Sequence, residues 1–296
     1  MTDTSARPRR SVLYMPGSKP RALDKARGLP ADVLILDLED AVVPAEKVAA
    51  RQQVLDAIAE GGYGSRELVI RINGLDTGWG ADDLTAAASS GADAVLIPKV
   101  ETAGMIADVI ARLDAAGASD SLAIWAMMET PLGMLNAAAI AASSPRLACL
   151  VMGTNDLVKE LDAAHTEARL PVITALGLCM LAARAHGQAI VDGVYNAYKD
   201  EDGLRASCLQ GKEMGFDGKT LIHPAQLDVT NAVFAPSPDE IELANRYVTA
   251  FAETEAAGQG VAVVDGRIVE NLHVETAKKL LARAEAIATL EKELTP

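Results

Sequence analysis

Eight short apolar segments recur along most of the chain, and their alternation with helix-like segments is the feature that most limits the fold. The apolar segments are residues 11–17, 32–42, 67–74, 94–101, 122–131, 149–157, 189–195 and 219–226. Segments this apolar are typical of parallel strands covered by helices on both faces. Eight of them favour a (β/α)₈ barrel. A doubly wound open sheet is the alternative, although no Gly-x-Gly-x-x-Gly turn follows the first strand.

The last sixty residues depart from this alternation. Residues 239–256 are amphipathic and follow a helix start signal at Ser237, and a final helical segment spans residues 274–293. Between them, an Asp265–Gly266 pair predicts a tight turn between two short strands. This part is too small for a core of its own. We therefore expect a catalytic barrel over residues 1–235 and, over residues 236–296, a helical arm or lid that packs on the barrel or on a neighbouring subunit.

Composition narrows the class of protein. The 296 residues are 50% apolar and 3% aromatic with a net charge of -14, which disfavours nucleic-acid binding. The longest uncharged apolar stretch, residues 170–183, is shorter than the roughly 18 residues of a membrane span, and no apolar signal segment follows the N-terminus. Three widely spaced cysteines, Cys149, Cys179 and Cys208, indicate a reducing compartment. We expect a cytoplasmic protein without nucleic-acid or membrane partners.

Charge is unevenly distributed along the chain. The first 27 residues contain seven basic and two acidic residues, a local charge of +5. Such a cluster is suited to a polyanionic ligand, and the alternative for residues 7–10 is a solvated, frayed terminus. Lys19, Arg21 and Lys25 follow a predicted strand and turn, so they are the better candidates for ligand binding.

Polar residues stand at the ends of the predicted strands. They are Glu39, Asp40, Arg71, Asn73, Lys99, Glu101, Glu129, Asn155, Asp156 and His223. In a (β/α)₈ barrel these positions meet at one rim, where the active site lies. Charged groups at the ends of apolar strands are costly to desolvate unless they are paired or bind a metal. Their convergence predicts a functional site.

Glu129 and Asp156 end neighbouring predicted strands. Two carboxylates without cysteine or a histidine pair are typical ligands of a hard cation, Mg²⁺ or Mn²⁺, with open positions for water and substrate. The alternative is that each carboxylate caps the helix that follows it. Because both residues come to the same rim, we favour the metal.

Three further side chains have more than one interpretation. The guanidinium of Arg71 is suited to binding a substrate carboxylate, but Glu39 and Asp40 are alternative partners within the protein. His223 is a general base or a structural hydrogen-bonding group, and the structural role is favoured. Lys99 neutralises the carboxylates or acts as an acid; a Schiff base is disfavoured because carboxylates keep its ammonium protonated.

The ordered strand-end motifs resemble the citrate lyase β-subunit-like family of the HpcH/HpaI aldolase/citrate lyase superfamily. The matching segments are RSVLYMPGSKPRALDKA, LDLEDAV, RINGLDT, IPKVE, METPLG, GTNDL, IHPAQ and VDGR, spread over residues 10–290. The family includes malyl-CoA, β-methylmalyl-CoA and citramalyl-CoA lyases and a malyl-CoA thioesterase. The resemblance implies a (β/α)₈ barrel in homotrimers or homohexamers that acts on short β-hydroxyacyl-CoA thioesters with Mg²⁺.

The resemblance also implies roles for individual residues. Glu129 and Asp156 would hold the metal, Arg71 would bind the carboxylate of the keto-acid half, and Glu39 with Asp40 would order the metal shell.

The resemblance further implies a CoA site at the basic N-terminal region and a site residue in the arm. The CoA contacts would be Tyr14, Lys19, Arg21 and Lys25. An aspartate in the family's arm reaches a neighbour's active site, and Glu270 stands at that position here, with the same charge and one more methylene.

The leading expectation for function is cleavage of a malyl-CoA-like thioester into an acyl-CoA and glyoxylate or pyruvate, with Glu270 as a candidate proton donor. The first alternative is hydrolysis of (3S)-malyl-CoA to malate and CoA. A non-catalytic acyl-CoA-binding protein and a keto-acid aldolase that does not use CoA are two further alternatives. The intact set of Arg71, Glu129 and Asp156 argues against a non-catalytic binding protein. The basic N-terminal cluster argues against an aldolase that does not use CoA.

Overall fold

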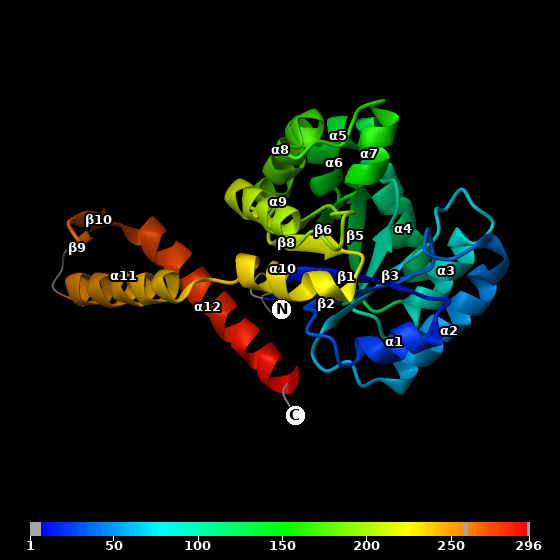
Figure 1. Ribbon diagram of the computed structural model, residues 1–296, viewed down its shortest axis with the longest axis horizontal. Coiled ribbons are helices and arrows are strands. Elements are labelled where there is room, and N and C mark those ends of the chain that lie inside the picture. Colours follow the sequence, from blue (N-terminus) through cyan, green and yellow to red (C-terminus); the bar gives the residue numbers. More distant parts are fainter. Residues whose placement is uncertain (1–6, 257–259, 295–296) are drawn as a thin grey trace. The chain divides into compact units, whose positions relative to one another are not determined.

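The computed structural model describes residues 7–256 and 260–294, and its first part is a closed barrel of eight parallel strands (Figure 1). The strands are β1 (Ser11–Pro16), β2 (Val33–Asp37), β3 (Glu67–Arg71), β4 (Ala94–Ile97), β5 (Ala123–Met128), β6 (Leu147–Met152), β7 (Ala189–Asp192) and β8 (Gly218–Leu221). Each strand pairs with the next, and β1 pairs with β8 to close the ring. The predicted (β/α)₈ barrel is confirmed, and the open sheet is wrong.

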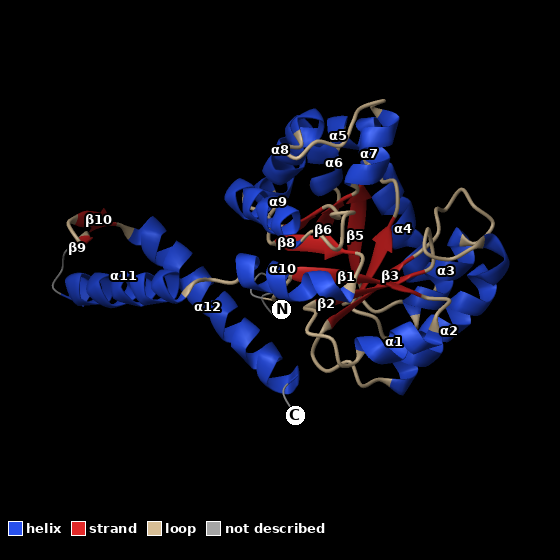
Figure 2. Cartoon of the chain, viewed as in Figure 1, coloured by secondary structure: helices blue, strands red, loops and turns tan. Residues whose placement is uncertain are grey.

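Helices surround these strands, as the blue ribbons around the red arrows in Figure 2 show. They are α1 (Pro20–Ala26), α2 (Lys47–Glu60), α3 (Gly80–Ala88), α4 (Ala103–Ala115), α5 (Pro131–Leu135), α6 (Ala137–Ala141), α7 (Thr154–Glu160), α8 (Leu170–Ala185), α9 (Glu201–Met214) and α10 (Leu227–Phe234). Two 3₁₀ turns, Pro44–Glu46 and Pro224–Gln226, precede α2 and α10. The helices thus cover the outer face of the barrel.

Alternate side chains of each strand form two separate cores. Val33 and Ile35 of β2 cluster inside the barrel with Trp125 of β5, in a group made only of strand residues. Leu34 and Leu36 point the other way and pack with helical residues in a larger cluster. Because successive side chains of a strand alternate between faces, residues two apart share the barrel interior. This alternation directs the last residues of each strand into the mouth of the barrel.

The N-terminal basic residues next to β1 are structural. The Arg9 guanidinium is bidentate to Glu67, with contacts of 2.7 and 2.9 Å, and Arg10 is bidentate to Asp32, with contacts of 3.0 and 2.9 Å. All four side chains are buried where β1, β2 and β3 begin. Both sequence-based interpretations, a frayed terminus or a ligand site, are wrong for Arg9 and Arg10. The predicted barrel boundary at residue 1 lies outside the described residues.

Residues 9–234 form one compact unit, and the remaining described residues form a second. The second unit contains α11 (Pro238–Ala256), the antiparallel strands β9 (Ala262–Val264) and β10 (Arg267–Val269), and α12 (Asn271–Leu294). The Ser237 hydroxyl accepts a hydrogen bond from the Glu240 amide at 3.1 Å, so the predicted helix start is confirmed. Asp265 and Gly266 have φ of 51° and 74°, as a type I′ hairpin turn requires.

A small core joins the elements of this second unit, so the expectation that this part is too small for a core of its own is wrong. Val264 and Val269 of the hairpin are buried with Val274 of α12, and Tyr247 and Phe251 of α11 pack against them. The hairpin and α12 are therefore held on α11. The predicted end of the arm at residue 296 lies outside the described residues.

The described residues also bear on two expectations from composition. No helix among them combines the length and apolar character needed to cross a bilayer. Cys149, Cys179 and Cys208 are buried and form no disulfide, which is consistent with structural thiols.

Candidate active site

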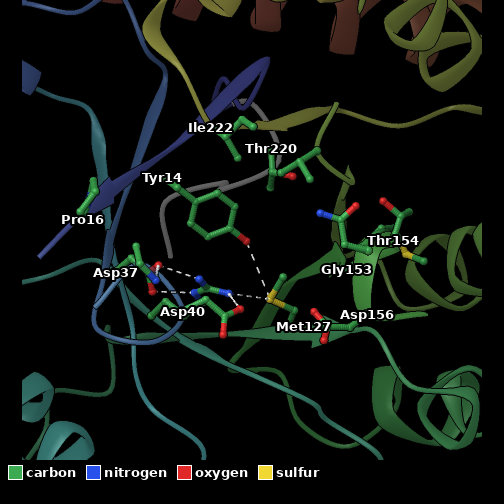
Figure 3. Close-up of a pocket in the computed structure, with 15 residues that line it drawn as sticks. Tyr14, Pro16, Asp37, Asp40, Met127, Gly153, Thr154, Asp156, Thr220 and Ile222 are labelled. Atoms are coloured by element: carbon green, nitrogen blue, oxygen red, sulfur yellow. Dashed lines mark hydrogen bonds and ion pairs between the residues drawn. The ribbon is translucent and has the colours of Figure 1, made fainter. Parts of the chain in front are cut away.

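A cavity of about 360 Å³ opens at the carboxyl ends of the barrel strands (Figure 3). Its lining comes from strand ends and the loops after them: Tyr14, Pro16, Asp37, Asp40, Ala41, Arg71, Met127, Met152, Gly153, Thr154, Asn155, Asp156, Val194, Thr220 and Ile222. This is the position at which (β/α)₈ barrels carry their active sites. Five of the residues singled out from the sequence line it: Tyr14, Asp40, Arg71, Asn155 and Asp156.

Arg71 is held by carboxylates of the neighbouring strand. Its Nε and Nη2 donate to Oδ1 and Oδ2 of Asp37 at 2.7 and 2.6 Å, and its Nη1 lies 2.8 Å from Glu39 Oε2. Asp40 is more distant, at 3.6 Å, and its side chain is 73% exposed. Of the five guanidinium N–H groups, three are directed at Asp37 and Glu39. The second N–H of Nη1 faces the Met127 sulfur at 3.9 Å. One N–H, on Nη2, therefore remains for a ligand, and both interpretations of Arg71 are compatible with the geometry.

Asp37 was not among the residues predicted from the sequence. It is 1% exposed and stands opposite Arg71 in the β2–β3 register, and its carboxylate also accepts the Glu39 and Ala41 amides. The sequence pattern of β2 could have identified it. Val33 and Ile35 face the barrel interior, and Asp37, two residues further on, faces the same way.

Tyr14 and Met127 form the wall of the pocket beside Arg71. The Arg71 guanidinium lies 4.8 Å from the centre of the Tyr14 ring, a cation–π contact, and the Tyr14 hydroxyl lies 3.8 Å from the Met127 sulfur. Burial raises the pKa of Tyr14 well above its usual value, so the phenol stays protonated as a hydrogen-bond donor. Figure 3 shows this hydroxyl directed across the pocket. Tyr14 therefore belongs to the pocket itself.

Burial also changes the acidity of Glu39. Desolvation raises the pKa of Glu39 to about 8, and the charges of Asp40, Glu129 and Asp37 act in the same direction against the attraction of Arg71. The site thus concentrates more negative charge than its arginine neutralises.

Glu129 follows β5 and is 2% exposed. Its Oε1 accepts the Lys99 amide at 2.8 Å, and burial, together with the charge of Asp156, raises its pKa to about 7. A Cβ atom on Gly153 would lie 2.4 Å from the Glu129 Cβ and 2.5 Å from its Oε2, so a glycine is required there. The cap of α5 is Thr130, whose hydroxyl accepts the Gly133 amide at 3.1 Å. The helix-capping alternative for Glu129 is therefore wrong.

Asp156 lies in the first turn of α7 and is partly buried at the pocket. Its carboxylate accepts no hydrogen bond from the described residues, whereas its charge reaches both Glu129 and Lys99. In the described part of the chain, no group of three or more His, Cys, Asp or Glu side chains is arranged to hold a metal. Glu129 and Asp156 are thus a pair of carboxylates, one of them uncommitted, which would leave most coordination positions to water and substrate.

Lys99 stands at the same rim in a left-handed backbone conformation, with φ of 48°. Partial burial acts to lower the pKa of Lys99, but the charges of Asp156, Glu129 and Glu39 outweigh it and raise the pKa above its usual value. The ammonium is therefore held protonated, which agrees with the argument against a Schiff base. A non-glycine residue with positive φ is uncommon and is often found at functional sites.

Two other predicted strand-end residues have structural partners. The His223 Nδ1 accepts the Ala225 amide at 3.1 Å and caps the 3₁₀ turn Pro224–Gln226, so the structural interpretation of His223 is confirmed. Asn73 is buried and donates to Asp83 through both its amide and its side chain, at 3.1 and 2.6 Å. Neither residue lines the pocket.

The basic cluster of the N-terminal region lies on and beside α1. Lys19, Arg21 and Lys25 are exposed, and Lys19 is 3.8 Å from Glu46. They follow β1 and therefore start from the same end of the barrel as the pocket.

Glu270 belongs to the second unit, between β10 and α12. Its side chain is exposed and its amide donates to the His273 Nδ1 at 3.1 Å. All residues that line the pocket belong to the barrel unit.

A closed barrel with an arginine and several carboxylates at its strand ends defines a (β/α)₈-barrel enzyme site. Residues 10–224 match the sequence model of the HpcH/HpaI aldolase/citrate lyase family, and the chain belongs to this family. The resemblance found in the strand-end motifs is thereby confirmed.

Three relatives show how similar this chain is to known proteins. It is 61% identical to the (3S)-malyl-CoA thioesterase of Cereibacter sphaeroides strain KD131, over 96% of this chain and 97% of that protein. It is 35% identical to the citrate lyase subunit beta of Escherichia coli strain K12, over 94% of each. The solved structure of CitE from Mycobacterium tuberculosis in complex with magnesium, acetoacetate and coenzyme A is 28% identical, with a TM-score of 0.75 over 95% of this chain and 99% of that one.

Proposed function

We propose that this chain is a thioesterase that hydrolyses (3S)-malyl-CoA to malate and free CoA. The observation that carries the proposal is the 61% identity to a protein of that activity along 96% of the chain. The sequence alone favours carbon–carbon cleavage over hydrolysis. With this identity, hydrolysis becomes the main proposal and carbon–carbon cleavage the second candidate. The reaction adds water across the thioester: the C–S bond breaks, hydroxyl goes to the acyl carbon and the proton goes to sulfur.

The pocket supports a short acyl group as the part of the substrate that enters the barrel. Its volume of about 360 Å³ is at the small end of the range for ligand pockets, so the nucleotide of CoA would remain outside. The uncommitted Nη2 N–H of Arg71 would donate to the terminal carboxylate of the malyl group. Tyr14 would contact the acyl end of the substrate, and Lys19, Arg21 and Lys25 would contact the CoA phosphates.

The pair of Glu129 and Asp156 fits a hard divalent cation, Mg²⁺ or Mn²⁺. Both donors are carboxylates and Asp156 is uncommitted. Burial, together with the charge of Asp156, raises the pKa of Glu129, and a cation held between the two carboxylates would offset this. When bound, the ion would polarise substrate oxygens as a Lewis acid. Glu39 and Asp40 would order its shell, and the Lys99 ammonium would balance the remaining carboxylate charge.

Glu270 has a proposed role in a homotrimer or homohexamer, where the arm of one subunit would bring it to the active site of another. There its carboxylate would help water attack the thioester. The test mixes two inactive variants, Glu129→Gln and Glu270→Gln: recovery of activity on mixing is expected, and no recovery would contradict a role between subunits.

Lyase activity is the second candidate function. The 35% identity to a citrate lyase subunit favours carbon–carbon cleavage by the same strand-end residues, releasing glyoxylate and acetyl-CoA. The test that separates the two supplies (3S)-malyl-CoA and Mg²⁺ and measures free thiol and glyoxylate independently. Thiol without glyoxylate supports the proposal, glyoxylate without thiol supports the lyase, and neither product overturns both.

A further inference from the structure

A second cavity, of about 450 Å³, lies on the rim of the barrel beside the candidate active site, with which it shares Thr154 and Val194. Its walls are the segment 164–172 that leads into α8, the segment 194–200 after β7, and the first turns of α9. The proposed function uses none of the residues that line this cavity alone. It combines an apolar wall with a partly buried cation.

The cation is Arg169, which lines the cavity from the start of α8 in a left-handed conformation with φ of 55°. Its Nη1 donates to both carboxylate oxygens of Asp192 at 2.7 Å, and its Nε donates to Gln210 Oε1 at 2.6 Å. Its Nη2 is buried and has no hydrogen-bond partner among the described residues. A buried donor without a partner is rare in proteins and indicates an absent water or ligand.

Charge near Arg169 is unbalanced as well. Asp192 is also paired with Lys219, at 2.8 Å, so two cations share one carboxylate. The exposed fractions of the three side chains are 13% for Arg169, 0% for Asp192 and 1% for Lys219. One buried positive charge is therefore uncompensated within this cluster, which is costly unless an anion joins it.

Two acidic residues also line the cavity, but neither supplies a buried negative charge to balance the cations around Asp192. Asp200 and Glu167 are exposed. The Asp200 carboxylate is engaged, because it accepts the Tyr195 hydroxyl at 2.6 Å and the Gly203 amide at 3.0 Å. Exposed charges are screened by solvent, whereas the Arg169 side chain is only 13% exposed and its Nη2 atom is buried.

We propose that this cavity binds a small organic carboxylate, with its anionic group on Arg169 and its hydrocarbon part against the apolar wall. A guanidinium matches the geometry of a carboxylate. Val158, Pro171 and Val172 supply the apolar contact. Because these side chains form an apolar wall, we expect a carboxylate with a hydrocarbon stem to bind better than inorganic phosphate. The site lies beyond the proposed thioesterase reaction and does not depend on it.

The test titrates butyrate into the full-length protein and follows binding by ligand-observed NMR. Arg169→Met removes the cation. Ala206→Trp fills the cavity from an exposed position on α9 and replaces none of the residues that form the ion pairs. Both variants should bind butyrate about tenfold more weakly or worse. The matched control is Arg184→Met, which removes an exposed arginine from the other end of α8 and should bind as the wild type does.

Thermal unfolding establishes that each variant is folded, and Ala206→Trp tests the site even if Arg169→Met does not fold. Inorganic phosphate and butylamine, the cation of the same length, are titrated in parallel. Three results would each overturn the proposal: unchanged butyrate affinity in Ala206→Trp or in folded Arg169→Met, binding of phosphate without butyrate, or equal binding of butylamine.

Discussion

Arg71 and Asp37 face each other across β3 and β2 as a bidentate ion pair, with N–O distances of 2.7 and 2.6 Å at the floor of the pocket. The pair fixes the plane of the guanidinium and leaves its remaining N–H groups for Glu39, for the Met127 sulfur and for a ligand. Asp37 thereby positions the residue that we propose to bind substrate, although it does not need to touch the substrate itself.

Removing one partner of this buried pair should be costly. Asp37→Asn is expected to lower the free energy of unfolding by about 3 kcal/mol, because it leaves the Arg71 charge only partly compensated in the barrel. Asp40→Asn is the matched control: its side chain is 73% exposed and 3.6 Å from Arg71, so the change should be below about 1 kcal/mol. Urea unfolding of both variants measures the difference, and equal effects would contradict the assignment.

The metal pair can be tested by direct binding. Glu129→Gln and Asp156→Asn should each abolish Mg²⁺-dependent turnover and weaken Mn²⁺ binding, measured by electron paramagnetic resonance, by about tenfold or more. Glu160→Gln changes an exposed carboxylate at the end of α7 and should leave both quantities unchanged. Wild-type Mn²⁺ affinity in either pocket variant would remove that residue from the metal site.

Gly153 is expected to be required for the position of Glu129. In Gly153→Ala the new methyl group would approach Glu129 to 2.4 Å, which forces the carboxylate to move and should reduce turnover at saturating substrate. Gly177→Ala is the control, because no atom outside the adjoining backbone of its own helix lies within 4 Å of the added methyl group. At this position inside α8, alanine should stabilise the protein by about 0.5–1 kcal/mol. Unchanged activity in Gly153→Ala would contradict the requirement for glycine at this position, because it would show that Glu129 can move without loss of turnover.

Lowering the pH should reduce the free energy of unfolding, because Asp192 becomes protonated and its ion pairs are lost. Burial acts to raise the pKa of Asp192, but Lys219 and Arg169 outweigh it and lower the pKa below its usual value. A carboxyl whose folded pKa is depressed contributes stability that is present above the unfolded pKa of about 3.9 and is lost as pH falls through the folded value.

The free energy of unfolding of wild type and Asp192→Asn, measured by urea from neutral pH downwards, tests this linkage. Wild type should be the more stable at neutral pH, and its advantage should shrink below about pH 4. Asp120→Asn, at an exposed position, should follow wild type throughout. If the stability difference between wild type and Asp192→Asn grew as the pH fell, the lowered pKa of Asp192 would be contradicted.

The barrel could be predicted from the sequence because eight apolar segments with helices between them admit few folds. Pocket residues such as Arg71 and Asp156 could be placed from their positions at strand ends. Asp37 is not evident from the strand-end motifs, because only the alternation of Val33 and Ile35 along β2 shows that its side chain points into the barrel. Arg9 and Arg10 were misjudged because their partners, Glu67 and Asp32, are distant in sequence and become neighbours only when the barrel closes.

The second cavity was beyond sequence reasoning for a related reason. Arg169, Asp192 and Lys219 come from three separate loops and strands, and no local pattern joins them. Their shared charge becomes visible only once β7, β8 and the start of α8 are placed together.

The central claim is that the pocket hydrolyses the thioester of (3S)-malyl-CoA, and the most direct measurement is turnover in oxygen-18 water with mass analysis of the products. Hydrolysis predicts malate that carries one oxygen-18 atom in its newly formed carboxylate, in an amount equal to the free CoA released. Formation of acetyl-CoA and glyoxylate in place of labelled malate would contradict the account.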